Sequence, residues 1–329
     1  MAEGQQTSPA PLLREIIVFG PPYMFIKYEK QFSSRYRILR PWESPIPLAQ
    51  FLETHAQNTQ AALITSFVSL SAAVLRNLPA LRLILTTSAG VDHIDIIECR
   101  RRGIAVVYAA AMFSADVADL AVGLLLDVLR KISAGNRFVK NGDWAKQGDY
   151  PLGFKLGGKK VGIVGLGNIG IEVAKRLEAF GCEVSYYSRN RKPSVSYVFY
   201  PDISELAAKS DILVVCCALT EQTHHIINRD ILLALGKKGV IVNIARGAVI
   251  DEKELVHFLQ QGDIAGAGLE VFENEPFAPK ELFELDNVVL SPHVANFTEE
   301  SFRDLYELVS ENLEAFFANK PLRSLVSEE

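Results

Sequence analysis

Apolar runs of strand length alternate with helical patterns over the first third of the chain. The runs cover residues 15–20, 36–40, 61–66, 81–88 and 104–109. Between them, residues 69–78 and 92–103 carry apolar side chains at helical spacing. Strands that alternate with helices of this length predict a parallel sheet with crossover helices. We expect an α/β domain of the flavodoxin-like type with five strands.

A second series of strands and helices begins at Lys159. It follows a helix predicted over 114–132 and a loop region, "NGDWAKQGDYPLG", at 141–153. Strands are expected near residues 160–165, 182–187, 211–216, 239–245, 264–271 and 287–291. Helices are expected near residues 168–180, 202–209, 228–235 and 251–262. The pattern predicts a second, larger doubly wound parallel-sheet domain.

Polar residues mark several helix starts. Ser114 is the expected N-cap of the helix at 114–132. Asp202 with Glu205, and Asp251 with Glu254, have capping-box spacing. A last helix, near 298–319, has one apolar face, and the pattern does not say which domain that face meets.

Composition narrows the class of protein. A length of 329 residues suits two domains, and 49% apolar with 22% charged residues is ordinary for a globular chain. The net charge of −5 argues against a nucleic-acid partner. The longest apolar stretch, 120–129, has about half the roughly 20 residues that span a bilayer and contains Asp127. With no secretory signal in "MAEGQQTSPAP" and no peroxisomal tripeptide at the end, we expect a cytoplasmic protein without a membrane partner.

The four cysteines show no metal-binding or redox spacing. Cys99, Cys182, Cys216 and Cys217 lie in apolar patterns without a Cys-x-x-Cys motif. Reduced, buried thiols are the favoured interpretation, and no metal site is expected.

A glycine-rich turn follows the first strand of the second domain, in "VGIVGLGNIG". Gly165, Gly167 and Gly170 have the G-x-G-x-x-G spacing between a strand and a helix. Such glycines permit a tight turn and close approach of a pyrophosphate to the helix N-terminus. The alternative is a turn that binds nothing, but its position favours a dinucleotide loop formed by Gly165, Leu166, Gly167, Asn168, Ile169 and Gly170.

The next strand ends without the acid that selects NAD in such domains. Its tip carries Ser188, Arg189, Arg191 and Lys192. A hydroxyl and cations suit the 2′-phosphate of NADP(H), whereas an acid would repel it. The alternative is a solvated basic loop. We predict NADP(H) as the cofactor.

Three polar residues follow three strands of the second domain. Arg246, Glu275 and His293 would all lie at carboxyl ends of parallel strands, on the ligand-binding edge of the sheet. A 2-keto acid needs a cation for its carboxylate, which Arg246 supplies. Hydride arriving at the carbonyl carbon requires a proton at the oxygen, for which His293 is the candidate acid and Glu275 its partner. Each residue alone has a structural explanation, as a surface arginine, a capping glutamate or a core histidine.

These residues lie in stretches that resemble the D-isomer-specific 2-hydroxyacid dehydrogenases. The matching stretches are "TTSAGVDHID", "ADVADLAVGLLL", "GKKVGIVGLGNIG", "NIARGAVIDE", "AGLEVFENEP" and "LSPHV". Within the family, the chain is most similar to plant-type hydroxyphenylpyruvate, glyoxylate and hydroxypyruvate reductases, which share the "SR" tip and prefer NADPH.

The resemblance implies further roles. Arg246, Glu275 and His293 match the catalytic triad, and the turn at Ser88, Ala89 and Gly90 would hold the substrate carboxylate together with Arg246 and His293. Further cofactor contacts would come from Ala218, Leu219, Thr223, Ile244, Ala245 and Glu270.

The resemblance also implies a domain organisation. Residues 1–109 with 294–329 would form the substrate domain, and residues 110–293 the NADP-binding Rossmann domain. The helix at 114–132 and the arm after it would build a homodimer, in which Trp144 reaches the partner's site.

Two positions depart from the family pattern. Glu270 stands where the family usually has the aspartate that contacts the nicotinamide amide, and its side chain is one methylene longer. "VANF" follows His293 in place of Gly-Ser, so that Phe297 would reshape the pocket.

The sequence therefore predicts an NADPH-dependent reductase of a 2-keto acid that forms the D (R) 2-hydroxy acid. A sugar-derived keto acid such as 2-keto-gulonate is an alternative substrate, and a cofactor-sensing corepressor-like binding protein is the alternative outside enzymes. Glu275 argues against a formate dehydrogenase, which has glutamine there. Five residues are candidates either for the pocket or for the core: Phe67, Met112, Phe113, Trp144 and Phe297.

Overall fold

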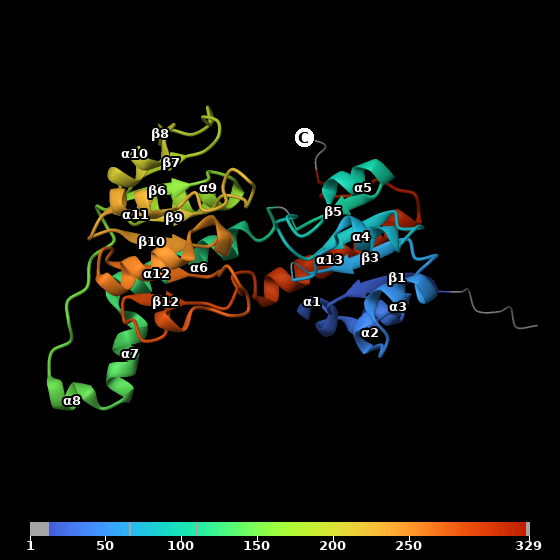
Figure 1. Ribbon diagram of the computed structural model, residues 1–329, viewed down its shortest axis with the longest axis horizontal. Coiled ribbons are helices and arrows are strands. Elements are labelled where there is room, and N and C mark those ends of the chain that lie inside the picture. The colour runs from blue at the N-terminus through green and yellow to red at the C-terminus, as the bar shows by residue number, and fades with distance from the viewer. Residues whose placement is uncertain (1–12, 66, 110, 327–329) are drawn as a thin grey trace, which may run out of the picture. The chain divides into compact units, whose positions relative to one another are not determined.

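The computed structural model describes residues 13–65, 67–109 and 111–326. It divides into two units, Met1–Met112 with Glu299–Glu329, and Phe113–Thr298 (Figure 1). The sequence placed these divisions at 109/110 and 293/294 instead. Residues 1–12 and 327–329, which bear on the expected targeting signals, and residue 66 of an expected strand lie outside the described residues.

The first unit contains a five-stranded parallel sheet in the order β2-β1-β3-β4-β5, the flavodoxin-like order, as predicted. Its strands are β1 Arg14–Phe19, β2 Tyr36–Leu39, β3 Ala61–Ile64, β4 Leu83–Thr86 and β5 Ala105–Val107. The central strands β3 and β4 are buried along their whole length, which explains their unbroken apolar runs.

Helices α3 Leu48–His55, α4 Ala72–Arg76 and α5 Ile96–Arg102 pack against one side of this sheet and share a hydrophobic cluster with it. The last helix, α13 Glu299–Phe317, packs in the same unit against α1 Tyr23–Lys27 and α2 Glu29–Ser33. Tyr28 and Tyr306 stack there with ring centroids 4.3 Å apart. A short 3₁₀ helix, η1 Pro41–Glu43, follows β2.

The second unit contains a seven-stranded sheet in the order β12-β11-β10-β9-β6-β7-β8, with every pair parallel. Its strands are β6 Lys160–Val164, β7 Glu183–Tyr187, β8 Val198–Tyr200, β9 Ile212–Val215, β10 Val240–Asn243, β11 Gly266–Leu269 and β12 Val288–Leu290. The short edge strand β8 is an addition to the predicted strands. The predicted class, two doubly wound parallel-sheet α/β domains, is confirmed.

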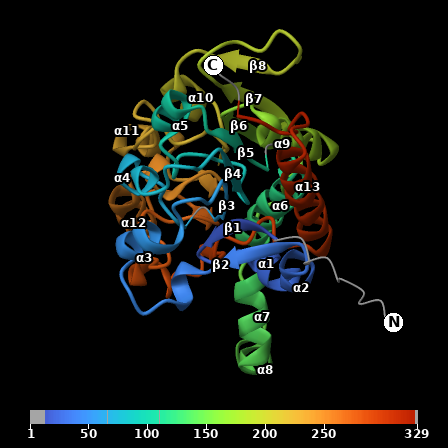
Figure 2. The same ribbon diagram turned by 90° about the vertical axis from the view of Figure 1, so that its right-hand side faces the viewer.

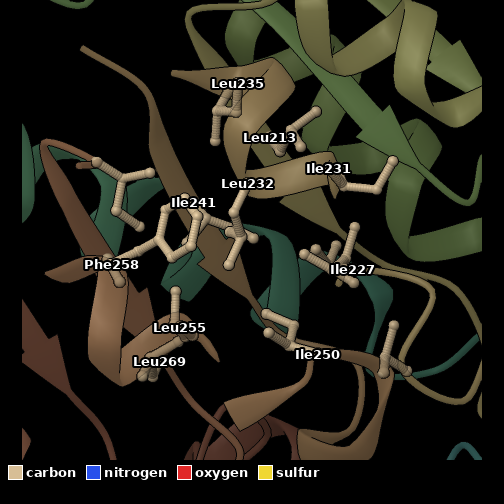
Figure 3. Close-up of a cluster of buried hydrophobic side chains, with 14 of the residues drawn as sticks. Leu213, Ile227, Ile231, Leu232, Leu235, Ile241, Ile250, Leu255, Phe258 and Leu269 are labelled. Carbon is tan, nitrogen blue, oxygen red and sulfur yellow. The ribbon is translucent and has the colours of Figure 1, made fainter. Parts of the chain in front are cut away.

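Helices cover both faces of the larger sheet. Leu232 and Phe258 come from α11 Arg229–Leu235 and α12 Glu252–Gln261 and pack in one cluster with strand residues such as Ile241 (Figure 3). The opposite face of β11 carries Gly266 and Gly268, where a Cβ would lie 2.8 Å and 3.0 Å from side chains of α6. The missing side chains therefore let helix α6, Ser114–Arg130, lie directly on the strand. The remaining elements are α9 Asn168–Ala179, α10 Ile203–Ala208, η2 Gly247–Val249 and η3 Lys280–Leu282.

Helix boundaries test the predicted caps. Asp202 accepts hydrogen bonds from the amides of Ser204 and Glu205, and Asp251 accepts one from Glu254, so both aspartates are the N-caps that the spacing predicted. The prediction for Ser114 is wrong. The Val117 amide bonds the Phe113 carbonyl, so helical bonding begins one residue earlier and Ser114 lies inside the first turn.

The region after α6 is more helical than predicted. Helix α6 ends at Arg130 because Lys131 adopts a φ of 54°. Helices α7 Ile132–Lys140 and α8 Asp143–Gln147 follow, so part of the expected loop at 141–153 is helical. They extend away from the seven-stranded sheet in both views (Figures 1 and 2). In residues 13–65, 67–109 and 111–326, no helix combines the length and apolar character needed to cross a membrane.

Candidate active site

Six loops of the second unit meet at one edge of its sheet. They follow β6, β7, β9, β10, β11 and β12, and every pair of neighbouring strands is parallel. Carboxyl ends of parallel strands lie along the same edge, where doubly wound sheets bind their ligands. The structure therefore brings every predicted site residue of this unit to that edge.

The glycine turn after β6 has the backbone that its sequence predicts. Gly165 has a φ of 98°, and a Cβ there would lie 2.6 Å from the Cα of Cys217. A Cβ on Gly170 would lie 2.3 Å from the Gly165 carbonyl oxygen. A Cβ on Gly167 would meet nothing within 4 Å, so this glycine faces open space at the start of α9. Two glycines thus close the turn, and one leaves room for a phosphate group.

The tip of β7 forms a tight basic turn. The Ser188 hydroxyl donates to the Asn190 carbonyl at 2.6 Å, and the Lys192 amide donates to the Tyr186 hydroxyl at 2.8 Å. Arg189, Arg191 and Lys192 are exposed. In the part of the chain that the structure describes, no carboxylate forms an ion pair with these three cations. The tip therefore presents uncompensated positive charge, whereas the hydrogen of Ser188 is engaged within the turn.

The loops after β9 and β10 supply the next predicted contacts. Thr223 donates to the Ala218 carbonyl at 2.6 Å and accepts from the Thr220 amide at 2.8 Å, which folds the segment that contains Leu219. Ile244 and Ala245 are buried at the end of β10.

Arg246 is positioned by a buried asparagine. The side chain of Asn243 accepts from the Ala245 amide and donates to the Arg246 carbonyl, both at 3.0 Å. A Cβ on Gly247 would lie 1.8 Å from the Phe272 carbonyl carbon, so the turn after Arg246 packs flat against the next loop. The Arg246 guanidinium donates to the Ala245 carbonyl at 2.8 Å. These contacts fix the backbone on both sides of Arg246.

Glu275 and His293 form the central pair of the site. Oε2 of Glu275 lies 2.7 Å from Nδ1 of His293, and its Oε1 accepts from the Phe272 amide at 3.1 Å. Burial raises the pKa of Glu275, but the hydrogen bond and the charge of His293, followed by the Phe272 amide and the Arg246 charge, together outweigh burial and hold that pKa below its ordinary value. Because Arg246 acts on the same carboxylate, the structure brings the three predicted catalytic residues together.

Glu270 is a buried acid at the end of β11, with 1% of its surface exposed. Its Oε1 accepts from the Ala295 amide at 2.5 Å, and its backbone carbonyl accepts from the His293 amide at 3.0 Å. Burial raises the pKa of Glu270 above its ordinary value, although hydrogen bonds from Ser291 and Ala295 oppose it. Within the described residues, Oε2 is buried without a hydrogen-bond partner.

The predicted carboxylate turn lies in the first unit, after β4. The Ser88 hydroxyl donates to the Gly90 carbonyl at 2.7 Å, and the Ser88 carbonyl accepts from the Ala109 amide at 3.0 Å. Thr86 lies 2.8 Å from the Ser88 hydroxyl and 3.0 Å from Nε2 of His93. The turn at Ser88, Ala89 and Gly90 is thus held by bonds within its own unit.

The five candidates for pocket or core separate in the structure. Phe113 is buried and belongs to the core. Met112 is half-buried. Phe67, Trp144 and Phe297 are exposed aromatic side chains.

The edge fits a dinucleotide. The glycine cradle admits a pyrophosphate, the basic tip offers charge for a phosphate, and the orphaned Oε2 of Glu270 is an acceptor for an amide group. For a metal ion, the described residues contain no group of three or more His, Cys, Asp or Glu side chains suited to hold one.

Sequence reasoning missed the residues that support the site. Asn243 and Glu252 are buried polar residues next to strand or helix ends. Both residues border an apolar run of the sequence. A polar residue that is buried there must form hydrogen bonds, so this sequence position could have indicated a supporting role.

Comparisons with known proteins agree with this geometry. The family model "D-isomer specific 2-hydroxyacid dehydrogenase, NAD binding domain" matches residues 122–295. A glyoxylate/hydroxypyruvate reductase of Arabidopsis thaliana is 49% identical over 311 residues, which are 94% of this chain and 96% of that protein. A hydroxyphenylpyruvate reductase of Plectranthus scutellarioides is 46% identical over 294 residues, 89% of this chain and 93% of that protein.

A solved structure is similar across both units. It is that of an NADPH-dependent glyoxylate/hydroxypyruvate reductase from Sinorhizobium meliloti in complex with NADP and malonate. The TM-score is 0.88 at 32% identity, covering 96% of this chain and 97% of the other. The resemblance that the motifs indicated is confirmed.

Proposed function

Since the chain belongs to the D-isomer-specific 2-hydroxyacid dehydrogenase family of oxidoreductases, we propose that it reduces a 2-keto acid to the D (R) 2-hydroxy acid with NADPH. We further propose that Phe113–Thr298 binds the cofactor and that the other unit contributes the carboxylate turn.

One observation carries the proposal: a histidine–carboxylate pair with an arginine acting on it, on the ligand edge of a dinucleotide-type sheet. A dinucleotide bound at this edge would supply the hydride that the carbonyl carbon accepts. Arg246 binds the substrate carboxylate and polarises its carbonyl. Nδ1 of His293 faces Glu275, so Nε2 is the nitrogen that donates the proton to the carbonyl oxygen. Glu275 stabilises the protonated ring before transfer and fixes its orientation.

The substrate that the relatives favour is a small keto acid. Their names refer to glyoxylate, hydroxypyruvate and hydroxyphenylpyruvate. An exposed Phe297 beside the His293 loop is compatible with an aromatic substrate, because aromatic side chains favour offset contact with another ring. We propose this group of 2-keto acids as the substrate class.

The choice of NADPH rests on the tip of β7. Three exposed cations without ion pairs among the described residues favour a phosphate dianion over a free ribose hydroxyl. The cofactor named for the Sinorhizobium meliloti protein supports the same choice.

The test is oxidation of NADPH by the purified full chain with glyoxylate, hydroxypyruvate and 4-hydroxyphenylpyruvate. Chiral chromatography then identifies the enantiomer of the product. We expect turnover of at least one acid, the D product, and a lower kcat/KM with NADH. Tight dinucleotide binding without turnover of any acid would favour the binding-protein alternative.

We also propose a homodimer built by α6, α7 and the following arm. Apolar side chains remain exposed along this segment within Phe113–Thr298: Ile132, Val139, Trp144, Leu152 and Phe154. Apolar patches of this kind typically mark protein interfaces. Sedimentation velocity should give a dimer, and Val139→Glu with Phe154→Glu should give monomers, whereas an unchanged dimer would place the interface elsewhere.

A further inference from the structure

A second histidine–carboxylate pair lies beside the catalytic one. Nε2 of His225 is hydrogen-bonded to Oε1 of Glu273, and both residues are partly buried. Nδ1 of His225 lies 3.9 Å from Oδ2 of Asp251, the N-cap of α12. The His224 ring stacks on the His225 ring with centroids 4.0 Å apart. The mechanism proposed above uses none of these four residues.

The loop that carries His225 is joined to the segment that follows Arg246. The His225 amide donates to the Ala248 carbonyl at 2.9 Å, and the Ile227 amide donates to the Val249 carbonyl at 3.1 Å. Ile227 and Ile250 lie side by side and are anchored in the hydrophobic cluster of this unit (Figure 3). These contacts therefore hold the backbone of His225 in place, at a φ of 50°.

The other end of the pair is joined to Glu275. The Phe272 amide donates to Oε1 of Glu275, and the Glu273 amide donates to Oε1 of the buried Glu252, both at 3.1 Å. The peptide between Phe272 and Glu273 lies against the backbone of Gly247. Glu273 and Glu275 are two positions apart, and one binds His225 while the other binds His293.

We infer that His225 and Glu273 are positioning residues that hold the segment from Phe272 to Glu275, and with it the carboxylate that faces His293. The inference rests on the proposed function, since it assigns the pair a role in that reaction. Glu252 binds the backbone amide of Glu273, and the His225 ring binds the Glu273 side chain, so two contacts hold the segment. Loss of either contact lets the Glu275 carboxylate move away from the His293 imidazole.

Several charged groups surround the pair. Asp251 and Glu252 face it from α12, and His224 faces it from its own loop. Arg246 acts on Glu275 from the turn after β10. A change confined to His225 leaves all of these groups in place.

The first test is His225→Asn. Asparagine tolerates a positive φ better than most residues, so the backbone is retained, but its amide is too short to reach Glu273. We expect kcat for the keto acid to fall by roughly 10-fold, within the ~10²-fold that small misplacements cost. The loss should fall on kcat, and the dissociation constant for NADPH should not change. His224→Asn, at the exposed neighbouring position, is the matched control.

Two variants of Glu273 give an independent measurement. Glu273→Ala should reproduce the loss, whereas Glu273→Gln keeps an acceptor for the imidazole and should retain most of the activity. Combining His225→Asn with Glu273→Ala should cost no more than either change alone, because residues of one interaction are not additive.

The outcomes separate the two proposals. If the wild type reduces keto acids and His225→Asn keeps the wild-type kcat, the positioning role is wrong. Equal losses in Glu273→Ala and Glu273→Gln, or additive losses in the double variant, would also overturn it. If the wild type reduces no keto acid, the proposed function is wrong, and the positioning role, which is defined for that reaction, is wrong with it.

Discussion

Nδ1 of His293 lies 2.7 Å from Oε2 of Glu275, and the two residues stand at the ends of neighbouring strands of the same sheet. The Glu275 carboxylate also accepts from the Phe272 amide, so its orientation is fixed before substrate arrives. A preorganised acid–base pair of this kind costs little reorganisation during reaction.

Replacing His293 should remove the proton donor and leave the cofactor site intact. We choose His293→Asn because the backbone has a φ of 55°, which asparagine tolerates. The kcat for keto-acid reduction should fall by about 10²–10⁴-fold, the contribution typical of general acid catalysis. NADPH binding, measured by quenching of tryptophan fluorescence, should be unchanged. Turnover at the wild-type rate would remove His293 from the mechanism.

Replacing Glu275 by glutamine should change both the activity and the pH dependence of stability. The kcat for keto-acid reduction should fall, because the carboxylate that orients the His293 ring is replaced by a neutral amide. The native pKa of Glu275 is lowered from 4.5, so its charge stabilises the folded state above about pH 5, and this contribution is lost as pH falls through the native pKa. The difference in Tm between wild type and Glu275→Gln should therefore disappear in acid. Parallel profiles for both proteins would show that the pair is uncoupled.

Glu270 should show the opposite dependence. Burial raises the pKa of Glu270 above 4.5, so below that pH the side chain is protonated and neutral in the folded protein. As pH rises through the native pKa, the buried carboxyl group ionises and the folded state is destabilised. The Tm of Glu270→Gln, relative to wild type, should increase between pH 4.5 and neutral pH. A constant difference would mean that Glu270 has the same pKa in the folded and unfolded states.

Shortening the same side chain tests its contact with the His293 loop. Oε1 of Glu270 reaches the Ala295 amide, and aspartate is one methylene shorter. We expect Glu270→Asp to lower both Tm and kcat, because a buried donor left without its partner costs about 1–3 kcal/mol. Wild-type Tm and kcat in Glu270→Asp would show that the loop adapts to the shorter acid.

Arg189 should decide the choice between the two cofactors. A charge-assisted bond to the 2′-phosphate contributes about 1.5–3 kcal/mol, so Arg189→Ala should weaken NADPH by about 10–150-fold. NADH lacks this phosphate, and its affinity should change little. Ser188→Asp combined with Arg189→Ala should favour NADH further, because the new carboxylate repels the phosphate. The measurement is kcat/KM for both cofactors at fixed ionic strength, and equal losses for both would indicate only a solvated loop.

The two sheets, the glycine turn and the set of residues at the ligand edge follow from local sequence patterns. Arg246, Glu275 and His293 were predictable because periodicity locates the ends of β10, β11 and β12. Parallel strands then carry the residues after those ends to one edge, whatever the details of packing. The N-caps Asp202 and Asp251 were predictable for a similar reason, since a capping bond joins residues only two or three positions apart.

The contacts that hold the site in place depend on packing between distant parts of the chain. His225 and Glu273 are 48 positions apart, and Glu270 meets the Ala295 amide across 25 positions. The bond between Asn243 and Arg246 spans three positions, but it matters because Asn243 is buried beneath the turn. Local pattern does not encode such contacts, because they depend on which loops pack together and on which polar atoms the packing leaves without water.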